Sequence, residues 1–185
     1  MIHYMNEIAK AIQILRYAEL DGRNGLPEDL FLTISGLVPL PNVDLLVINQ
    51  KQQILLAWRD DIFFEPSWHI PGGCLRYGES FEHRIQQTAL CELGTRVEFD
   101  PEPIAVRNVI RGANPALEHQ NERGHNVAIL FRCQLPNDFE INNSGKSEWE
   151  NGYLRWFDVL PHNFMRIQHV YFDVLKPWTS KKEDV

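Results

Sequence analysis

The sequence predicts an α/β domain in which helices cover both faces of a mixed β-sheet. Apolar strand-like segments alternate irregularly with segments of helical periodicity, as in such folds. The composition, 44% hydrophobic and 23% charged, is that of an ordinary globular protein. The length of 185 residues fits one domain with a short extension. No apolar run approaches the ~20 residues that a membrane span requires.

Residues 4–19 are predicted to form an amphipathic helix. Its apolar residues recur at spacings of three and four: Met5, Ile8, Ile12 and Leu15. Turn residues at 21–25 end the helix, and Pro27 then favours a second, short helical turn. We assign residues 1–36 to an N-terminal helical extension. Because an apolar stripe needs a surface to cover it, we expect this helix to pack on the domain or on a second copy in a homodimer.

Residues 37–185 are expected to form the main domain, which begins with two strands. The segment 43–49 is apolar on both faces apart from Asp44, as in a buried strand. A second strand at 53–58 follows after the polar turn 50–52. The short connection predicts that the two strands pair as a hairpin.

The clearest helix of the domain is predicted at Ser80–Leu93. Its apolar stripe falls every four residues, at Phe81, Ile85, Ala89 and Leu93, and Gly94 ends it. The remaining elements are strands at 104–110 and 126–134, a polar loop at 112–124 between them, a strand at 153–157 and a closing helix at about 166–176. The loop is long enough to be a lid or a binding loop.

Charge and cysteine content exclude several classes of function. Eighteen Lys and Arg against twenty-five Asp and Glu give a net charge of −7, whereas non-specific nucleic-acid binding needs a basic surface. Cys74, Cys91 and Cys133 show no metal-ligand spacing, which indicates reduced thiols. The first residues lack the basic segment and apolar core of a signal peptide. We therefore expect a cytoplasmic protein with a small-molecule partner and neither a nucleic-acid nor a membrane partner.

The segment 68–79 and the helix after it resemble the signature of the Nudix hydrolases. Five positions match that signature in register: Gly73, Glu79, Ala89, Glu92 and Gly94. In the family, the glycine-rich loop approaches a diphosphate and the helix presents carboxylates that hold magnesium. The resemblance implies a Nudix-type α/β/α sandwich around a mixed β-sheet.

The signature is incomplete at the positions that bind metal. Gln87 stands where an arginine is expected, and Thr88 and Cys91 stand where two glutamates are expected. Only Glu92 remains on that face of the helix, and one carboxylate alone makes a poor magnesium site. Three hypotheses follow: an enzyme that completes the metal site from elsewhere, a catalytically impaired Nudix-fold nucleotide-binding module or sensor, or a chance glycine turn before a helix.

Over residues 35–175 the pattern is most similar to the GDP-mannose mannosyl hydrolases, whose reduced signature ends in Ala-Glu-Leu-Gly. This resemblance implies a single Mg2+, which Mn2+ can replace, held by four groups: Asp44, the Gly73 carbonyl, Glu92 and Glu150. With two diphosphate oxygens they would give the roughly six oxygen ligands of octahedral magnesium. An aspartate in an apolar strand is costly unless paired or metal-bound, so a capped buried acid is the alternative for Asp44. The alternative for Glu150 is one acid among several on a solvated loop.

Arginines are expected to hold the leaving group and the diphosphate. Of the three leaving-group arginines in that branch, Arg59 is retained, while Cys74 and Gln87 stand at the other two positions. Arg107 and Arg111 share one face of a regular strand and could replace the lost charge. A solvent-exposed strand face is the alternative for these two.

The general base is left open, because Asn151 stands where the branch has a histidine and an amide accepts no proton near neutral pH. Four residues are candidate replacements: Glu148, Glu150, His119 and His125. Glu79 is expected to steady the loop through a backbone amide or Arg84. Candidates for stacking on a base, all of which also suit a core, are Trp58, Phe63, Phe64, Trp149 and Tyr153.

We therefore expect a magnesium-dependent hydrolase of a nucleoside diphosphate linked to another moiety, with a nucleotide sugar as the preferred substrate class. Its expected catalytic residues are Glu92, Arg59 and Glu150, and its expected substrate-binding residues are Arg59, Arg107 and Arg111. Ligand binding without turnover is the alternative. The sequence does not identify the base or the sugar, or whether water attacks phosphorus or the sugar carbon.

Overall fold

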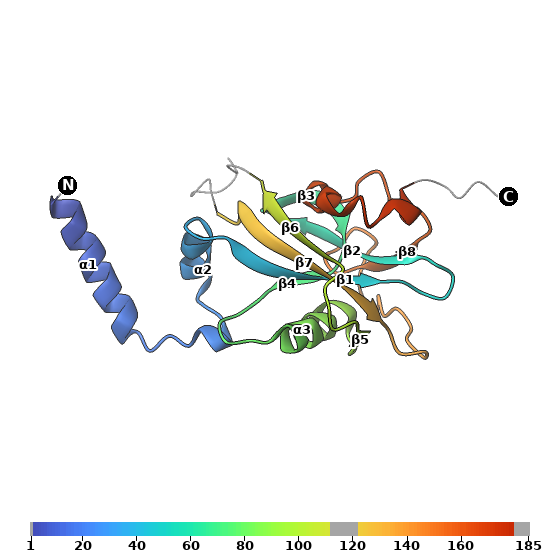
Figure 1. Cartoon of the computed structure of the whole chain (residues 1–185), viewed down its shortest axis with the longest axis horizontal. Helices are drawn as coiled ribbons and strands as arrows, with labels where there is room; N and C mark the ends of the chain where they lie inside the picture. Colours follow the sequence, from blue (N-terminus) through green and yellow to red (C-terminus); the bar gives the residue numbers. More distant parts are fainter. Residues whose placement is uncertain (1, 112–121, 180–185) are drawn as a thin grey trace.

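Two β-sheets form the centre of the molecule in the computed structural model, which describes residues 2–111 and 122–179 (Figure 1). The larger sheet contains β1 (Leu40–Val47), β4 (Gly72–Cys74), β5 (Glu98–Phe99), β6 (Ala105–Ile110) and β7 (His125–Gln134). The smaller sheet contains β2 (Ile54–Asp61), β3 (Phe64–His69) and β8 (Leu154–Phe157).

The larger sheet is mixed, as the sequence predicts. β1 runs parallel to β7 and antiparallel to β4, and β5 and β6 both pair antiparallel with β7. In the smaller sheet, β2 pairs antiparallel with both β3 and β8. The signature loop therefore folds back as β4 against the edge of β1, with Asp44 opposite Gly72 and Val43 opposite Gly73.

Helical segments cover both sides of the sheets. The helix α3 (Phe81–Leu93) packs on one side, and two 3-10 helices, η2 (Arg166–Tyr171) and η3 (Lys176–Trp178), pack on the other. Before β1 the chain forms α1 (Ile2–Tyr17), η1 (Gly22–Asn24) and α2 (Glu28–Ser35). The predicted α/β/α sandwich is confirmed.

Alternation along β1 assigns its side chains to two separate cores. Val43, Leu45 and Val47 pack with the apolar stripe of α3. Leu46 packs with Tyr171 and the C-terminal segment. Asp44 shares the second direction, since its carboxylate contacts η2, and therefore faces away from α3. This orientation decides which groups Asp44 can meet.

Most of the predicted elements are confirmed, and α3 is the best predicted. The Ser80 hydroxyl caps it by accepting a hydrogen bond from the His83 amide at 3.1 Å, and Gly94 ends it with φ of 74°. The predicted strands at 104–110, 126–134 and 153–157 correspond to β6, β7 and β8. The loop predicted at 112–124 lies largely outside the described residues.

One prediction about the pairing of the elements is wrong. The first and second strands do not form a hairpin, because β1 and β2 belong to different sheets, and the chain between them forms a single bridge from Ile48 to Ile54. The closing helix predicted at about 166–176 is present as the 3-10 helix η2, and the 3-10 helix η3 follows it. The strands β3, β4 and β5 were not predicted, since Pro66 and the Gly72-Gly73 pair conceal strand patterns.

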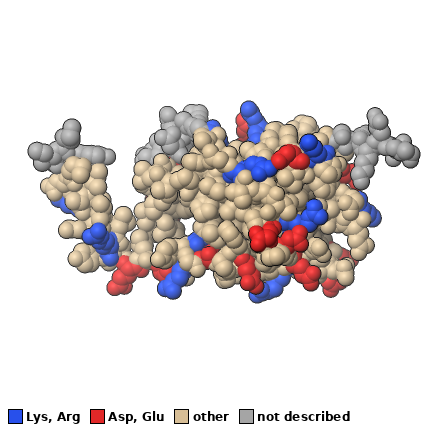
Figure 2. All heavy atoms as spheres, viewed as in Figure 1, with Lys and Arg blue, Asp and Glu red and all other residues tan. Residues whose placement is uncertain are grey.

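The N-terminal helix α1 extends away from the sheets (Figure 1). The side chains of its predicted apolar stripe are exposed, from 37% for Ile8 to 61% for Met5. The stripe therefore does not pack on its own domain, and packing on a second copy stays a prediction. Within the described ranges, no helix has the length and apolar character to cross a membrane. On the face shown in Figure 2, acidic and basic side chains are interspersed.

Candidate functional site

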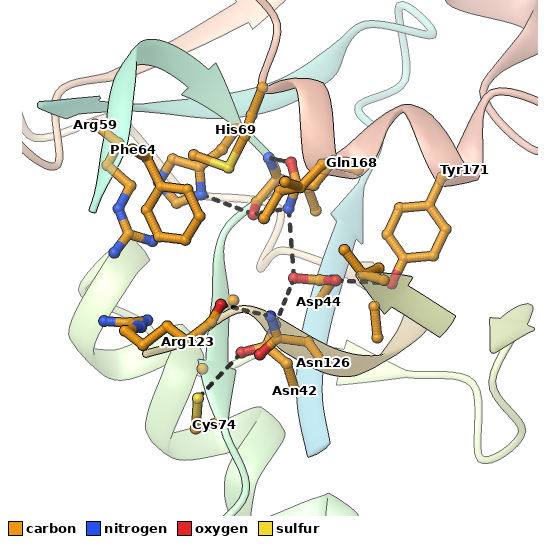
Figure 3. Close-up of a pocket in the computed structure, with 17 residues that line it drawn as sticks. Asn42, Asp44, Arg59, Phe64, His69, Cys74, Arg123, Asn126, Gln168 and Tyr171 are labelled. Carbon is orange, nitrogen blue, oxygen red and sulfur yellow. Dashed lines mark hydrogen bonds between the residues drawn. The ribbon is translucent and has the colours of Figure 1, made fainter. Parts of the chain in front are cut away.

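A cavity of about 90 Å3 lies where the two sheets meet the C-terminal segment (Figure 3). Residues of β1, β4, β6 and β7 form one wall, residues of β2 and β3 form another, and η2 closes one side. The polar side chains that line it are Asn42, Asp44, Arg59, His69, Cys74, Arg123, Asn126, Gln168 and Tyr171. The signature glycines Gly72 and Gly73 also line it, so the loop that carries the family resemblance borders the cavity.

Both signature glycines are required by close packing. A Cβ on Gly72 would lie 2.3 Å from an Asp44 carboxylate oxygen, and a Cβ on Gly73 would lie 2.7 Å from Thr88 Oγ1. Real Cβ atoms essentially never approach a heavy atom so closely. The absence of side chains here brings the loop backbone against β1 on one side and α3 on the other.

Glu79 holds the signature loop to α3, as predicted. Its carboxylate accepts hydrogen bonds from Arg84 Nε at 2.8 Å and from the Arg76 amide at 2.7 Å, and Arg84 Nη2 forms a second bond to it. Burial opposes ionisation, but these hydrogen bonds lower the pKa of Glu79. Glu79 therefore has a structural contact that does not depend on the missing motif arginine.

Asp44 is 3% exposed and its carboxylate is already enclosed by donors. Tyr171 Oη donates to Oδ2 at 2.7 Å, Asn42 Nδ2 donates to Oδ1 at 2.9 Å, and Gln168 Nε2 approaches Oδ1 at 3.4 Å (Figure 3). Burial raises the pKa of Asp44 to about 7, although the three donors oppose that shift. The carboxyl group is thus held as a capped buried acid, which was the alternative considered for it.

The two other carboxylates expected to bind metal, Glu92 and Glu150, do not line the cavity with Asp44. Glu92 belongs to α3 and does not line the cavity, although the charge of the cavity residue Arg59 acts on it. Burial raises the pKa of Glu92. Glu150 is exposed, and its carboxylate accepts the Ser147 amide at 3.2 Å within its own loop. Gly73 is the one member of the expected set, besides Asp44, that borders the cavity.

These residues do not fit a magnesium ion. In the two stretches that the structure describes, no group of three or more His, Cys, Asp or Glu side chains could hold a metal ion. A magnesium site uses carboxylate oxygens in near-octahedral geometry, whereas Thr88 and Cys91 occupy the helix positions expected to supply them. The Thr88 hydroxyl is buried and contacts no hydrogen-bond partner among the described residues.

Arg59 lines the cavity, as expected of a residue that contacts substrate. Its Nε donates to Asp61 Oδ2 at 2.5 Å, and its guanidinium carbon lies 4.3 Å from the centre of the Phe64 ring. Phe64 lines the same cavity, so the aromatic ring orients the arginine at the cavity wall. Phe64 was one of five candidates for stacking on a base, and here its ring contacts cations.

Arg107 and Arg111 have different partners. Arg107 pairs with Asp173 at 2.5 Å and donates to the Val170 carbonyl at 3.1 Å, so it tethers the C-terminal segment and does not line the cavity. The guanidinium carbon of Arg111 lies 4.8 Å from the centre of the Phe64 ring. Of the two, Arg111 alone lies close to Arg59.

Arg123 is a cavity residue that the sequence did not reveal. Arg123 lies in the short described segment between residues 112–121, which the structure does not describe, and β7. Its guanidinium carbon lies 4.9 Å from the centre of the Phe63 ring and 5.7 Å from the centre of the Phe64 ring. One arginine at the end of a polar loop carries no periodic signal. Gln168 and Tyr171 were missed for the same reason, since nothing in their spacing connects them with β1.

The candidate bases are placed away from the cavity or outside the described residues. Asn151 clamps the end of β2, because its side chain bonds both the amide and the carbonyl of Asp60, at 2.5 and 2.7 Å. Glu148 pairs with Arg155 at 2.5 Å, and His125 contacts Asn108 Oδ1 at 2.6 Å. His119 lies outside the described residues.

His69 borders the cavity as a neutral ring. It is 7% exposed, and its Nδ1 lies 2.9 Å from the Ile70 carbonyl, so this nitrogen carries the proton. Burial, and after it the charge of Arg59, lower the pKa of His69 to about 4. His69 therefore adds no positive charge to the cavity near neutral pH.

Comparison with known proteins agrees with this architecture. The MutT NUDIX hydrolase of Burkholderia pseudomallei has a TM-score of 0.54 at 18% identity, over 77% of this chain and 99% of that one. The MutT protein of Methanosarcina mazei Go1 has a TM-score of 0.53 at 18% identity, over 77% and 97%. A UDP-X diphosphatase has a TM-score of 0.51 at 18% identity, over 95% and 78%. Similarity at this level of identity concerns the fold.

A family model assigns the chain to a family, whereas the solved structures show only the fold. The model described as NUDIX domain matches residues 38–172, which is more than half of the chain and includes the signature loop, α3 and the cavity. Members of this family act on small-molecule nucleotides, generally with a divalent metal. The chain belongs to the Nudix hydrolase family.

Proposed function

We propose that the protein hydrolyses a nucleoside diphosphate linked to another moiety, with nucleotide sugars as the substrate class, and that the cavity holds the diphosphate. The observation that carries the proposal is that the signature loop and two arginines, Arg59 and Arg123, line one cavity. Guanidinium groups bind phosphate oxygens through paired N–H donors. Membership of a family of nucleotide hydrolases supports the same substrate class.

Arg59 is the residue best placed to steady the leaving phosphate. Asp61 fixes its Nε and Phe64 fixes the plane of its guanidinium, so its remaining N–H groups can face a ligand without a large loss of side-chain freedom. A positive charge fixed where negative charge develops lowers the barrier to bond cleavage. The same position is retained in the GDP-mannose mannosyl hydrolase branch, which we propose as the nearest in substrate chemistry.

A second candidate function is ligand binding without turnover. It is favoured by a specific observation, namely that the described residues form no cluster of three metal-binding side chains. The local contacts of Glu150 and Asn151 favour it as well, because both side chains are engaged in their own loop or at the end of β2. A module of this kind would retain the cavity and the arginines and lack product formation.

One experiment separates the two functions. The full chain is incubated with GDP-mannose, UDP-glucose, ADP-ribose and a dinucleotide polyphosphate, each with and without Mg2+, and products are separated by anion-exchange chromatography. Product from a nucleotide sugar supports the hydrolase, and hydrolysis in oxygen-18 water then identifies whether phosphorus or the sugar carbon is attacked. Binding measured by calorimetry with no product from any compound decides for the binding module.

A further inference from the structure

Three guanidinium groups surround one aromatic ring beside the signature loop. The guanidinium carbons of Arg59, Arg111 and Arg123 lie 4.3, 4.8 and 5.7 Å from the centre of the Phe64 ring. These arginines come from β2, from the end of β6 and from the segment before β7. In Figure 3 the guanidinium groups of Arg59 and Arg123 lie on the same side of the cavity, and Asp44 with Tyr171 lies on the other.

Little negative charge compensates this cluster within the described parts of the chain. Asp61 pairs with Arg59, and its other oxygen accepts the amides of Phe63 and Phe64. Among the described residues, no carboxylate lies within ion-pair distance of Arg111 or Arg123. Like charges held this close repel one another, and the repulsion is stronger in a partly buried site than in water.

The hydrogen-bonding capacity of the cluster is also incompletely used. Arg111 donates to the carbonyls of Phe63 and Glu122, yet its Nε is buried with no partner in the described structure. The Arg123 guanidinium contacts aromatic rings, and no described residue accepts a hydrogen bond from it. Each guanidinium has five N–H donors in a planar fork that matches phosphate oxygens. The cluster therefore needs an anion with several oxygens.

The electrostatic surroundings agree with an anion at this position. Burial lowers the pKa of Arg111 and of Arg123, and the charge of a neighbouring arginine also lowers each, while Asp61 raises both and Cys74 and Glu28 raise that of Arg123. Both groups remain protonated, since arginine does not lose its proton in proteins. A bound polyanion would relieve the repulsion among the three cations, and this gain would add to its affinity.

We propose that Arg59 and Arg123, with Arg111 against the same Phe64 ring, form a diphosphate-binding site that needs no divalent cation. The inference rests on the proposed function for the identity of the ligand, and it adds that guanidinium groups neutralise the diphosphate. The acid positions of α3 that would hold a metal are occupied by Thr88 and Cys91, and the Asp44 carboxylate already accepts three donors. Positive charge for the diphosphate therefore comes from the protein itself.

The test measures binding of inorganic pyrophosphate, GDP and GMP to the full chain in EDTA and in Mg2+. We expect pyrophosphate and GDP to bind in EDTA, with affinity changed less than threefold by Mg2+, and GMP to bind at least tenfold more weakly than GDP. Since the ligand is held by charge, affinity should fall steeply between 50 and 500 mM NaCl. Pyrophosphate binding equal to that of GDP would identify the free diphosphate as a sufficient ligand.

Three variants decide whether the cluster is responsible. Arg123→Gln is expected to weaken pyrophosphate binding at least tenfold in EDTA, and Arg123→Lys, which keeps the charge without the fork, is expected to weaken it less. The matched control is Arg132→Gln, because Arg132 is an exposed arginine of β7 outside the cavity. Thermal unfolding of each variant verifies that it is folded, and if Arg123→Gln is unfolded, the Lys variant and the wild-type protein in EDTA still give the answer.

The inference is overturned if pyrophosphate and GDP bind only with Mg2+, or if Arg123→Gln and Arg132→Gln weaken binding equally. Failure of the proposed function has a different signature. If pyrophosphate binds in EDTA through Arg123 and no nucleotide sugar is hydrolysed, the diphosphate site stands and the hydrolase proposal fails.

Discussion

The buried carboxyl group of Asp44 makes a quantitative prediction for stability, which the variant Asp44→Asn tests. Asn and Asp have nearly the same shape, and the amide oxygen of Asn can accept from Asn42 and Gln168 as Oδ1 does now. The amide nitrogen would meet Tyr171 Oη, which can accept a hydrogen bond. The substitution therefore removes the ionisable group and keeps the contacts.

The size of the effect follows from the pKa of Asp44, which rises from 3.8 to about 7 on folding. Because the native state holds this proton more tightly, the carboxyl group stabilises the fold. This contribution is fully present below the unfolded-state pKa and is lost as the pH rises to about 7. Each pKa unit corresponds to about 1.4 kcal/mol, so the whole shift corresponds to about 4 kcal/mol. Asp44→Asn lacks this loss, and its stability relative to wild type should rise by about 2.5 kcal/mol between pH 5 and pH 8.

The assay is urea unfolding followed by tryptophan fluorescence at several pH values, since the chain contains five tryptophans. The opposite pH dependence of His69, whose pKa falls to about 4 on folding, is common to both proteins and cancels in the difference. Asp138→Asn is the control, because Asp138 is an exposed aspartate outside the cavity. A difference between Asp44→Asn and wild type that stays constant from pH 5 to pH 8 would refute the reasoning about this carboxyl group.

Four further predictions concern the signature loop, α3 and the N-terminal helix α1. Gly73→Ala should lower the free energy of unfolding by about 1–3 kcal/mol, because the new Cβ meets the Thr88 hydroxyl. Adding Thr88→Ser, which keeps the hydroxyl, should recover little of this loss, whereas adding Thr88→Ala should recover most of it. Glu79→Gln should cost about 3 kcal/mol in urea unfolding, because it leaves the Arg84 guanidinium, 10% exposed, without its charge partner; a cost near zero would exclude a role for the pair. Glu92→Gln should not weaken pyrophosphate binding in EDTA, because Glu92 does not line the cavity and the substitution removes a negative charge that acts on Arg59; a tenfold loss of affinity would contradict this placement. Deleting residues 1–20 should halve the mass measured by light scattering if α1 forms the proposed homodimer contact, and an unchanged mass contradicts that role.

The sequence predicts the layers of this fold well because periodicity is a local property. The stripe of Ile85, Ala89 and Leu93 is visible every four residues, and the structure places all three in the core with β1. The pairing of β1 with β2 was predicted wrongly for the same reason. A short connection favours a hairpin locally, yet here the chain crosses between sheets, and the pairing of β1 with β7 depends on contacts about 85 residues away along the chain.

The site was less predictable, since it depends on which face each side chain occupies and on segments far apart in sequence. Asp44 was correctly singled out as a costly residue in an apolar strand, but its partners Gln168 and Tyr171 come from a 3-10 helix whose spacing gave no signal. The alternation along β1 turns Asp44 away from α3, and Glu92 does not line the cavity that Asp44 borders. A resemblance aligns residues along the chain, and it does not show whether their side chains face one another.

The threonine at position 88 of the signature also changes whether the signature loop needs a cation to pack on α3. Thr88 is 3% exposed and packs against Gly73, so a glutamate at this position would place a charged group in a buried contact that only a cation could balance. With threonine there, the loop and α3 can pack without a metal. The charged groups that remain beside the loop are arginines, which attract a diphosphate directly. Ligand affinity in this protein should accordingly respond to ionic strength and not to magnesium.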